Sequence, residues 1–195
     1  MGAYAPVLDI TPDIEDRITQ RILRQLMKGL LEDEIDYRGF LYIGLMIDGE
    51  GNPYVLEFNC RSGDPETQVI LPLMDSDLLN HLHACADGKL AGENIRVKDT
   101  NALCVVAAAP KYPGTPPKGL VVDGMPEERE NLIVYHGGTR LDGGRVVTNG
   151  GRVFGITGTG PLKEAHNNVY SAIRRMTAGG KPFYFSTTIG QLGIE

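Results

Sequence analysis

The stretch YVLEFNCRSGDPETQ, from Tyr54 to Gln68, decides how this chain is expected to fold, because it reads as a strand, a break and the start of a helix. Alternate side chains of a strand point to opposite faces. A carboxylate and an amide oxygen would therefore project side by side from one face. That face would carry Val55, Glu57 and Asn59, and the other would carry Tyr54, Leu56 and Phe58.

Glu57 and Asn59 form a candidate metal site. Mg2+ prefers oxygen ligands, keeps several waters and completes its shell with nucleotide phosphates. If the strand continues through Cys60, Arg61 joins the same face and adds a planar cation that grips a phosphate or acyl-phosphate oxygen. The pattern indicates a phosphoryl-transfer site. From the spacing alone, a half-solvated strand face is the alternative interpretation.

The strand is expected to break at Ser62-Gly63, where a helix begins. Asp64 has the position of an N-cap, Pro65 that of the first helical residue, and Glu66 places an acid in the first turn. From the residues alone, Asp64 and Glu66 are either helix-capping groups or part of the site.

A long helix is expected to precede this stretch, and the first part of the stretch is expected to form the second strand of a β-hairpin. Thr11 has the position of an N-cap before Pro12. The apolar run from residue 40 to 47 predicts a central strand, and turn residues 48–53 lead back into the strand that contains Glu57. The apolar stripe of the helix would comprise Ile14, Ile18, Ile22, Leu26 and Leu30.

Pro72 is expected to end the short helix after Asp64, and another helix is predicted from near Ser76-Asp77 to Gly88. His81 and His83 lie two positions apart on it and therefore on different faces, so they cannot chelate one metal ion, and we expect both at the surface. The expected inward positions are Leu78, Leu79, Leu82 and Cys85.

The polar, aperiodic segment 91–100 predicts a boundary between a domain of residues 1–95 and a domain of residues 96–195. The second domain reads as short strands with one helix from about Pro161 to Met176. Its glycine pairs are typical of tight β-turns and not of a nucleotide-binding loop. The expected strands span residues 102–109, 119–122, 132–136, 145–148, 152–157 and 183–185.

The 195 residues are 42% hydrophobic and 23% charged, which is ordinary for a globular protein. A net charge of -6 argues against a general nucleic-acid binder. No apolar run approaches the length of a membrane span, and the sequence predicts a cytoplasmic protein without membrane contact. Cys60, Cys85 and Cys104 lack metal-like spacing and are expected to be reduced thiols.

The segment VLEFNCRSGDPETQ resembles the signature of phosphoribosylamine-glycine ligase (glycinamide ribonucleotide synthetase), an ATP-grasp family of purine biosynthesis. Other segments resemble successive parts of the same family in the same order, so the resemblance covers essentially the whole chain. These segments are MGAYAPV at 1–7, YRGFLYIGLMID at 37–48, SDLLNHLHACADGKL at 76–90, YPG at 112–114, HGGTRL at 136–141 and VVTNGGRVFGITG at 146–158.

The resemblance implies an α+β fold: the C-terminal part of an ATP-grasp large lobe, built as an antiparallel sheet with helices, followed by a small mainly-β domain with one helix. It also implies a ligase in which ATP phosphorylates the carboxylate of glycine and 5-phosphoribosylamine attacks the acyl phosphate. Glu57 and Asn59 would hold Mg2+ or Mn2+ against the ATP phosphates, and Arg61 would stabilise the moving γ-phosphoryl group. Asp64 and Glu66 would be the catalytic candidates for contact with the amine-bearing substrates.

The chain departs from the family in two ways. Many ATP-grasp enzymes carry another acidic ligand about twelve residues before the E-x-N pair, where this sequence has Gly44-Leu45-Met46. The resemblance also covers only the C-terminal half of the family, so we expect a fragment that is inactive alone and that requires the N-terminal half as a partner. The alternatives are another ATP-grasp ligase or carboxylase, and a non-catalytic remnant or assembly module.

Overall fold

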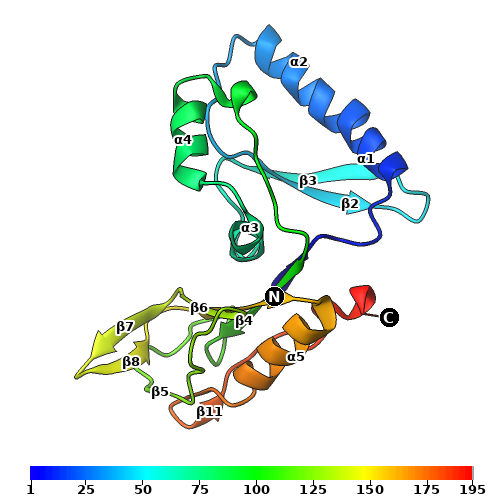
Figure 1. Ribbon diagram of the computed structural model, residues 1–195. Coiled ribbons are helices and arrows are strands. Elements are labelled where there is room, and N and C mark those ends of the chain that lie inside the picture. Colours follow the sequence, from blue (N-terminus) through cyan, green and yellow to red (C-terminus); the bar gives the residue numbers. More distant parts are fainter. Residues whose placement is uncertain (195) are drawn as a thin grey trace. The chain divides into compact units, whose positions relative to one another are not determined.

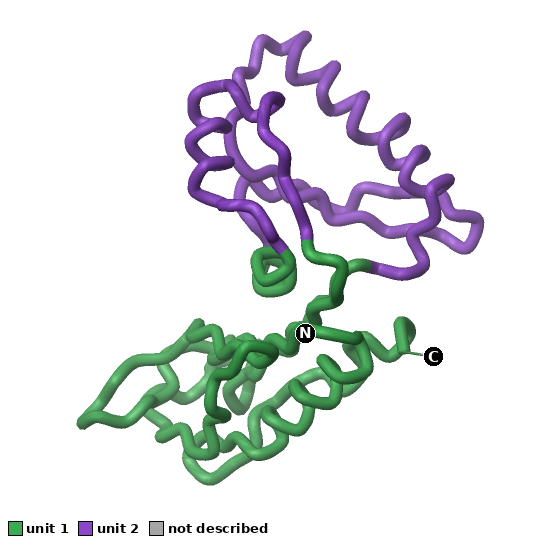
Figure 2. Tube along the Cα trace, viewed as in Figure 1, with its two compact units in different colours: residues 1–6, 64–73, 98–195 green, residues 7–63, 74–97 purple. Residues whose placement is uncertain are grey.

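The computed structural model describes residues 1–194, which form two compact units. Unit 1 comprises residues 1–6, 64–73 and the chain from residue 98 onward, and unit 2 comprises residues 7–63 and 74–97 (Figure 2). Helices and antiparallel sheets occur together, which confirms the predicted α+β class (Figure 1). These units interleave along the chain, and the division into domains at residues 95 and 96 stays a prediction.

Unit 2 begins with one long helical rod. Helices α1 (Pro12–Ile18) and α2 (Arg24–Glu32) are joined by the π-helical turn η1 (Thr19–Leu23), and the N-cap Thr11 accepts a hydrogen bond from the backbone N–H of Ile14, as predicted. The predicted stripe repeats every four residues, so it drifts around an α-helix of about 3.6 residues per turn. The wider π turn takes up part of that drift, and Ile22 within it is buried.

The predicted hairpin is present, with β2 (Tyr42–Ile47) antiparallel to β3 (Pro53–Asn59), and the helical rod lies along it (Figure 1). The prediction of its faces was partly wrong. The register pairs Gly44 with Glu57 but Leu45 with Val55, so β3 contains one extra residue, a β-bulge. The bulge leaves Glu57 and Asn59 on one face but moves Val55 to the opposite face.

Helix α4 (Leu78–Ala86) begins as predicted, because the Asp77 carboxylate accepts hydrogen bonds from the backbone N–H groups of residues 79 and 80. Its inward face was predicted only partly correctly: Leu78 and Cys85 are half-buried, but Leu79 is 62% exposed. His81, which was expected at the surface, is only 7% exposed. His81 Nδ1 lies 3.1 Å from Glu93 Oε2, and its Nε2 lies 2.7 Å from Ser76 Oγ. Because both ring nitrogens have partners, burying the imidazole costs little. The short 3-10 helix η2 spans Leu90–Gly92.

The four-stranded antiparallel sheet of unit 1 has the order β1-β4-β9-β6, formed by Gly2–Ala5, Asn101–Ala108, Arg152–Gly160 and Leu132–His136. Helix α5 (Leu162–Ile173) packs on one face of it (Figure 1). The predicted strands 132–136 and 145–148 are confirmed to the residue. The remaining elements are β5 (Val122–Asp123), β7 (Thr139–Asp142), β8 (Arg145–Thr148), β10 (Thr177–Ala178), β11 (Lys181–Pro182) and η3 (Gln191–Gly193).

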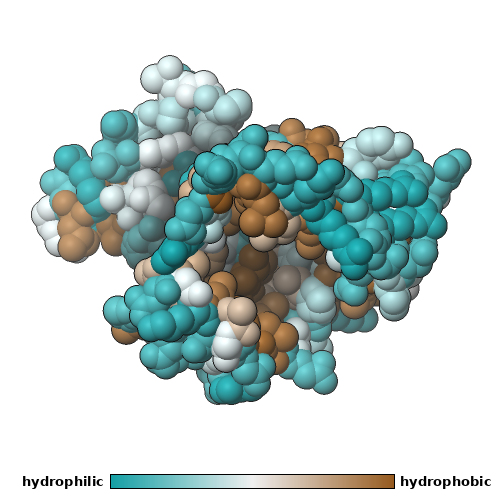
Figure 3. Space-filling view, turned by 90° about the horizontal axis from the view of Figure 1, so that it is seen from above, coloured by the Kyte–Doolittle hydropathy of each residue, from teal (hydrophilic) through white to brown (hydrophobic). Residues whose placement is uncertain are grey.

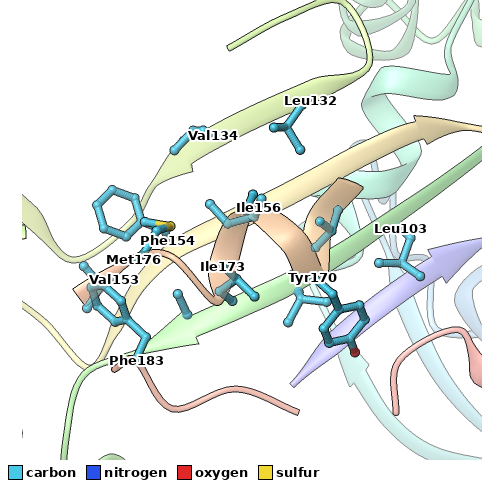
Figure 4. Packing of buried hydrophobic residues seen from close by; sticks show 14 of the residues in the cluster. Leu103, Leu132, Val134, Val153, Phe154, Ile156, Tyr170, Ile173, Met176 and Phe183 are labelled. Carbon is cyan, nitrogen blue, oxygen red and sulfur yellow. The ribbon is translucent and has the colours of Figure 1, made fainter. Parts of the chain in front are cut away.

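The central strands β4 and β9 of this sheet are buried over most of their length. Leu103 of β4 points into the main core with Tyr170 and Ile173 of α5 (Figure 4), and Val105 belongs to the same cluster. Cys104, between them in sequence, points the other way and packs in a second cluster with Val69 of α3 (Thr67–Leu73). The sequence of β4 is therefore an almost continuous apolar run, as expected of a strand that is covered on both faces.

Helix α3 starts at Thr67, two residues later than predicted, and Pro72 lies inside it instead of ending it. Residues 64–66 form a turn, so Asp64 is not the N-cap. Its carboxylate is instead bound by Arg152 Nη1 at 2.9 Å and by Gln68 Nε2 at 2.9 Å. The Asp64 carboxylate therefore binds Arg152, which is distant in sequence, in place of the backbone N–H groups that an N-cap residue would bind.

Within residues 1–194, no helix is long and apolar enough to cross a bilayer. The cysteines Cys60, Cys85 and Cys104 are all free thiols, as predicted. They differ in environment, because Cys60 is exposed whereas Cys104 is fully buried. Burial raises the pKa of the Cys104 thiol to about 11.

We expect an aromatic disulfide that reacts with free thiols at about pH 8 to modify Cys60 rapidly in the native chain. It should modify Cys104 only after unfolding. The thiolate is the reactive form, and burial both hides Cys104 and disfavours its ionisation. Absorbance of the released thiol counts the modified groups. The variant Cys104→Ala should give the native count of the wild type and lose one group only in denaturant; rapid native modification of all three thiols would contradict the burial of Cys104.

Two glycine substitutions should change stability in opposite directions. A Cβ on Gly138 would lie 2.6 Å from Gly150 Cα and 2.8 Å from the Arg152 carbonyl oxygen, so Gly138→Ala should lower the free energy of unfolding by about 1–3 kcal/mol. No described atom outside its own helix lies within 4 Å of a Cβ on Gly29 of α2, so Gly29→Ala should raise it by about 0.5–1 kcal/mol. Urea unfolding of both variants measures these changes, and equal effects would contradict the close backbone approach at Gly138.

Candidate functional site

Strand β3 brings Glu57 and Asn59 together on one face of the hairpin, because their register partners Gly44 and Tyr42 lie two positions apart on β2. Gly44 leaves the space that the Glu57 side chain occupies: a Cβ at residue 44 would lie 3.1 Å from Glu57 Cγ. The missing side chain at Gly44 therefore helps to seat Glu57 over the sheet. Glu57 is exposed and Asn59 is half-buried.

Arg61 contacts Asn59, but not as a residue of the strand, as was predicted. The strand ends at Asn59, so Arg61 does not join its face as a strand residue. Its guanidinium folds back instead: Nη2 donates to Asn59 Oδ1 at 3.2 Å, and Nη1 donates to the Ser62 carbonyl oxygen at 3.0 Å. The structure thus brings Asn59 and Arg61 into direct contact.

The oxygen atoms of Glu57 and Asn59 fit a hard divalent cation such as Mg2+. Asn59 Oδ1 has two lone pairs, so it retains an acceptor position beside the Arg61 hydrogen bond. Within residues 1–194 there is no group of three or more His, Cys, Asp and Glu side chains with the geometry of a metal site. The candidate ligand set on this strand is therefore one carboxylate and one amide oxygen.

Asp64 and Glu66 belong to unit 1, whereas Glu57, Asn59 and Arg61 belong to unit 2. The Asp64 side chain is 48% exposed and is held on both carboxylate oxygens, Oδ2 by Arg152 and Oδ1 by Gln68. Glu66 is half-buried in the turn that leads into α3, and its carbonyl oxygen accepts the backbone N–H groups of residues 69 and 70.

Sequence reasoning missed Arg152 as the partner of Asp64, and Tyr112 as the partner of Arg152. Arg152 Nε donates to Tyr112 Oη at 3.2 Å, and Nη1 donates to both the carbonyl oxygen and the carboxylate of Asp64. Hydrogen bonding to Tyr112 and to Asp64 raises the pKa of the Arg152 guanidinium, which keeps it charged. The available sequence signal was a cation at the start of a buried apolar strand, next to the glycines of the segment NGGRV.

A pocket of about 480 Å³ lies elsewhere in unit 1. Glutamate and arginine side chains line it together with apolar ones, and none of the predicted site residues contributes to it. Its lining residues are Gly124, Met125, Pro126, Glu127, Glu128, Arg129, Leu132 and Arg175.

Two family models match the chain. Residues 1–67 match the ATP-grasp (A) domain of phosphoribosylglycinamide synthetase, and residues 102–191 match the C domain of the same enzyme. The first match includes Glu57, Asn59, Arg61 and Asp64, and the second includes Arg152.

Curated relatives match most of the chain. The phosphoribosylamine–glycine ligase of Ralstonia nicotianae is 43% identical over 94% of this chain and 44% of its own length. That of Escherichia coli O157:H7 is 45% identical over 89% of this chain and 41% of its own length. The trifunctional purine biosynthetic protein adenosine-3 of Gallus gallus is 47% identical over 80% of this chain and 16% of its own length. The chain thus spans less than half the length of these relatives.

Solved structures agree with the family models. The phosphoribosylamine–glycine ligase of Thermotoga maritima superposes with a TM-score of 0.79 and 36% identity, over 94% of this chain and 45% of that chain. A biotin carboxylase domain of Hydrogenobacter thermophilus 2-oxoglutarate carboxylase, in complex with MgADP and bicarbonate, superposes with a TM-score of 0.58 over 96% of this chain and 40% of that chain. At 19% identity the carboxylase shows a shared fold alone. With both domain models, the curated relatives and the Thermotoga structure in agreement, this chain belongs to the phosphoribosylamine–glycine ligase family of ATP-grasp proteins.

Proposed function

We propose that this chain forms part of an enzyme that joins glycine to 5-phosphoribosylamine at the expense of ATP, through glycyl phosphate, in purine biosynthesis. The observation that carries the proposal is the placement of Glu57 and Asn59 on one strand face, with the Arg61 guanidinium hydrogen-bonded to Asn59. Two oxygen ligands beside a cation suit the transfer of a phosphoryl group, which requires positioning and charge neutralisation more than covalent help from the protein.

Glu57 and Asn59 would hold Mg2+ or Mn2+ against the ATP phosphates. Bound there, the metal ion neutralises negative charge on the phosphate oxygens. The Arg61 guanidinium adds a fixed positive charge where the γ-phosphoryl oxygens gain charge, as the carboxylate of glycine attacks phosphorus and ADP leaves. The hydrogen bond to Asn59 orients that guanidinium before substrate arrives.

Asp64 and Glu66 would contact the amine-bearing substrates. The Asp64 carboxylate is half-exposed, and each of its oxygens accepts one hydrogen bond from a side chain. A carboxylate oxygen has two acceptor positions, so Asp64 retains acceptor capacity for an ammonium or amine group. The attack of the amine on glycyl phosphate forms the new amide and releases phosphate.

The proposed enzyme also needs the part of the family fold that these residues do not contain. Large apolar side chains are exposed on the hairpin of unit 2, among them Met46, Tyr54, Leu56 and Phe58. Hydrophobic patches lie among hydrophilic ones at the surface (Figure 3). Exposed apolar surface of this kind marks an interaction site, and the relatives, which are more than twice as long, have further polypeptide with which to cover it.

Calorimetric titration of the 195-residue chain with Mg-ATP should detect no binding in the micromolar range. Nucleotide sites are concave and bury most of the ligand, and the candidate metal strand is exposed along most of its length. The same titration of the chain joined to the remaining sequence of the Ralstonia relative should show micromolar binding. Tight binding by the 195 residues alone would show that they contain a complete nucleotide site.

Replacement of Glu57 by Gln tests the metal strand in that joined enzyme. Glutamine keeps the shape of the side chain but removes the negative charge that a divalent cation needs, so kcat/KM for Mg-ATP should fall by about 100-fold or more. Asn59→Ala should cause a smaller loss, because a neutral oxygen binds the cation less strongly. The melting temperature without metal should change little for Glu57→Gln. Full activity of Glu57→Gln with a lowered melting temperature would assign Glu57 a structural role.

A further inference from the structure

Arg152 connects parts of unit 1 that are far apart in the sequence. Its Nη1 atom lies 3.0 Å from the carbonyl oxygen of Asp64 and 2.9 Å from Asp64 Oδ2, across 88 positions of sequence. One nitrogen thus binds both the backbone and the side chain of Asp64. Because the two contacts come from different parts of the residue, Arg152 restrains the direction of the carboxylate as well as the path of the chain.

Arg152 is itself held from behind. Its Nε atom donates to Tyr112 Oη, and the Tyr112 ring packs closely against Gly151, where a Cβ would approach Tyr112 Cδ2 to 2.5 Å. The carbonyl oxygen of Arg152 accepts the backbone N–H of Gly138 at 2.7 Å. The guanidinium is therefore held in place by the hydroxyl of Tyr112, by the close packing of Tyr112 on Gly151, and by the backbone pairing of Arg152 at the start of β9.

The other carboxylate oxygen of Asp64 is also held. Gln68 Nε2, in the first turn of α3, donates to Asp64 Oδ1 at 2.9 Å. The carboxylate is thereby gripped between β9 and α3, yet its side chain remains 48% exposed and that of Arg152 40% exposed. A rigid carboxylate that faces solvent is suited to bind a substrate amine in one orientation.

We infer that Arg152 is a positioning residue for the amine-bearing substrate: together with Tyr112 it fixes the Asp64 carboxylate that receives that substrate. Arg152 acts through Asp64 and does not itself contact ATP. The kinetic consequence rests on the proposed function, whereas the structural one, an ordered turn at residues 64–66, does not.

The 195-residue chain tests the structural consequence by amide hydrogen exchange. In Arg152→Gln, the amides of Gln68, Val69 and Ile70, which bond to the carbonyl groups of residues 65 and 66, should exchange about five- to ten-fold faster. The matched control is Arg140→Gln, because Arg140 forms a 2.9 Å ion pair with Asp142 at similar exposure on the β7–β8 hairpin. Exchange at these amides should not change in Arg140→Gln. Equal exchange in wild type and Arg152→Gln would overturn the inference.

Steady-state kinetics of the chain joined to the remaining Ralstonia sequence test the catalytic consequence. Arg152→Gln should lower kcat/KM for 5-phosphoribosylamine by at least about ten-fold while KM for ATP stays within about two-fold. Arg152→Lys keeps the charge but loses the forked geometry, so its kcat/KM for 5-phosphoribosylamine should lie between those of the wild type and Arg152→Gln. Asp64→Asn combined with Arg152→Gln should cost no more than Asp64→Asn alone, because both act on one carboxylate.

The outcomes separate the inference from the proposed function. An equal loss of activity for every substrate, with KM values unchanged, would mean that Arg152 only maintains the fold, and it would overturn the inference. If the joined wild-type enzyme ligates no glycine, the proposed function fails, and hydrogen exchange alone then decides whether Arg152 orders the turn. Faster exchange with the selective loss for the amine substrate supports both.

Discussion

The structure of unit 1 depends on the antiparallel pairing of β4 with β9. Both strands are buried on their two faces, by α5 on one side and, at β4, by α3 on the other. Backbone groups buried in this way have no water to bind, so their hydrogen bonds must be made in one register. That register pairs Arg152 with Ala108 at the end of the sheet, where the arginine side chain reaches Asp64.

Segments that resemble the family by sequence converge at this end of the sheet. Tyr112 comes from the YPG segment, Gly138 from HGGTRL, Arg152 from NGGRV and Asp64 from GDPETQ. The glycines in them serve close packing: Gly138 meets the backbone of Gly150, and residue 151 meets the Tyr112 ring. The glycine pairs that the sequence predicted to form β-turns therefore also leave space for Tyr112 and Arg152, and Arg152 binds Asp64.

The candidate metal strand has the opposite character. β3 belongs to a two-stranded sheet and is exposed over most of its length, and Ile22 is the buried apolar residue of the helical rod beside it. The relatives extend well beyond the part that this chain matches. The Asp64 carboxylate in unit 1 is thus held by side-chain partners on both oxygens, while the strand with the proposed metal ligands in unit 2 exposes apolar side chains.

The sequence by itself determined the α+β class, the hairpin around Glu57, the start of α4 and most strands of the C domain, because local periodicity and turn residues decide these features. It also placed Glu57 and Asn59 on one face. Tertiary structure alone decided that Val55 lies opposite them, because the β-bulge arises from strand pairing. It also decided that His81 is buried, because Ser76 and Glu93 bind both its nitrogens. Asp64 likewise binds Arg152 and not the helix start, because its partner lies 88 positions away, beyond the reach of local pattern.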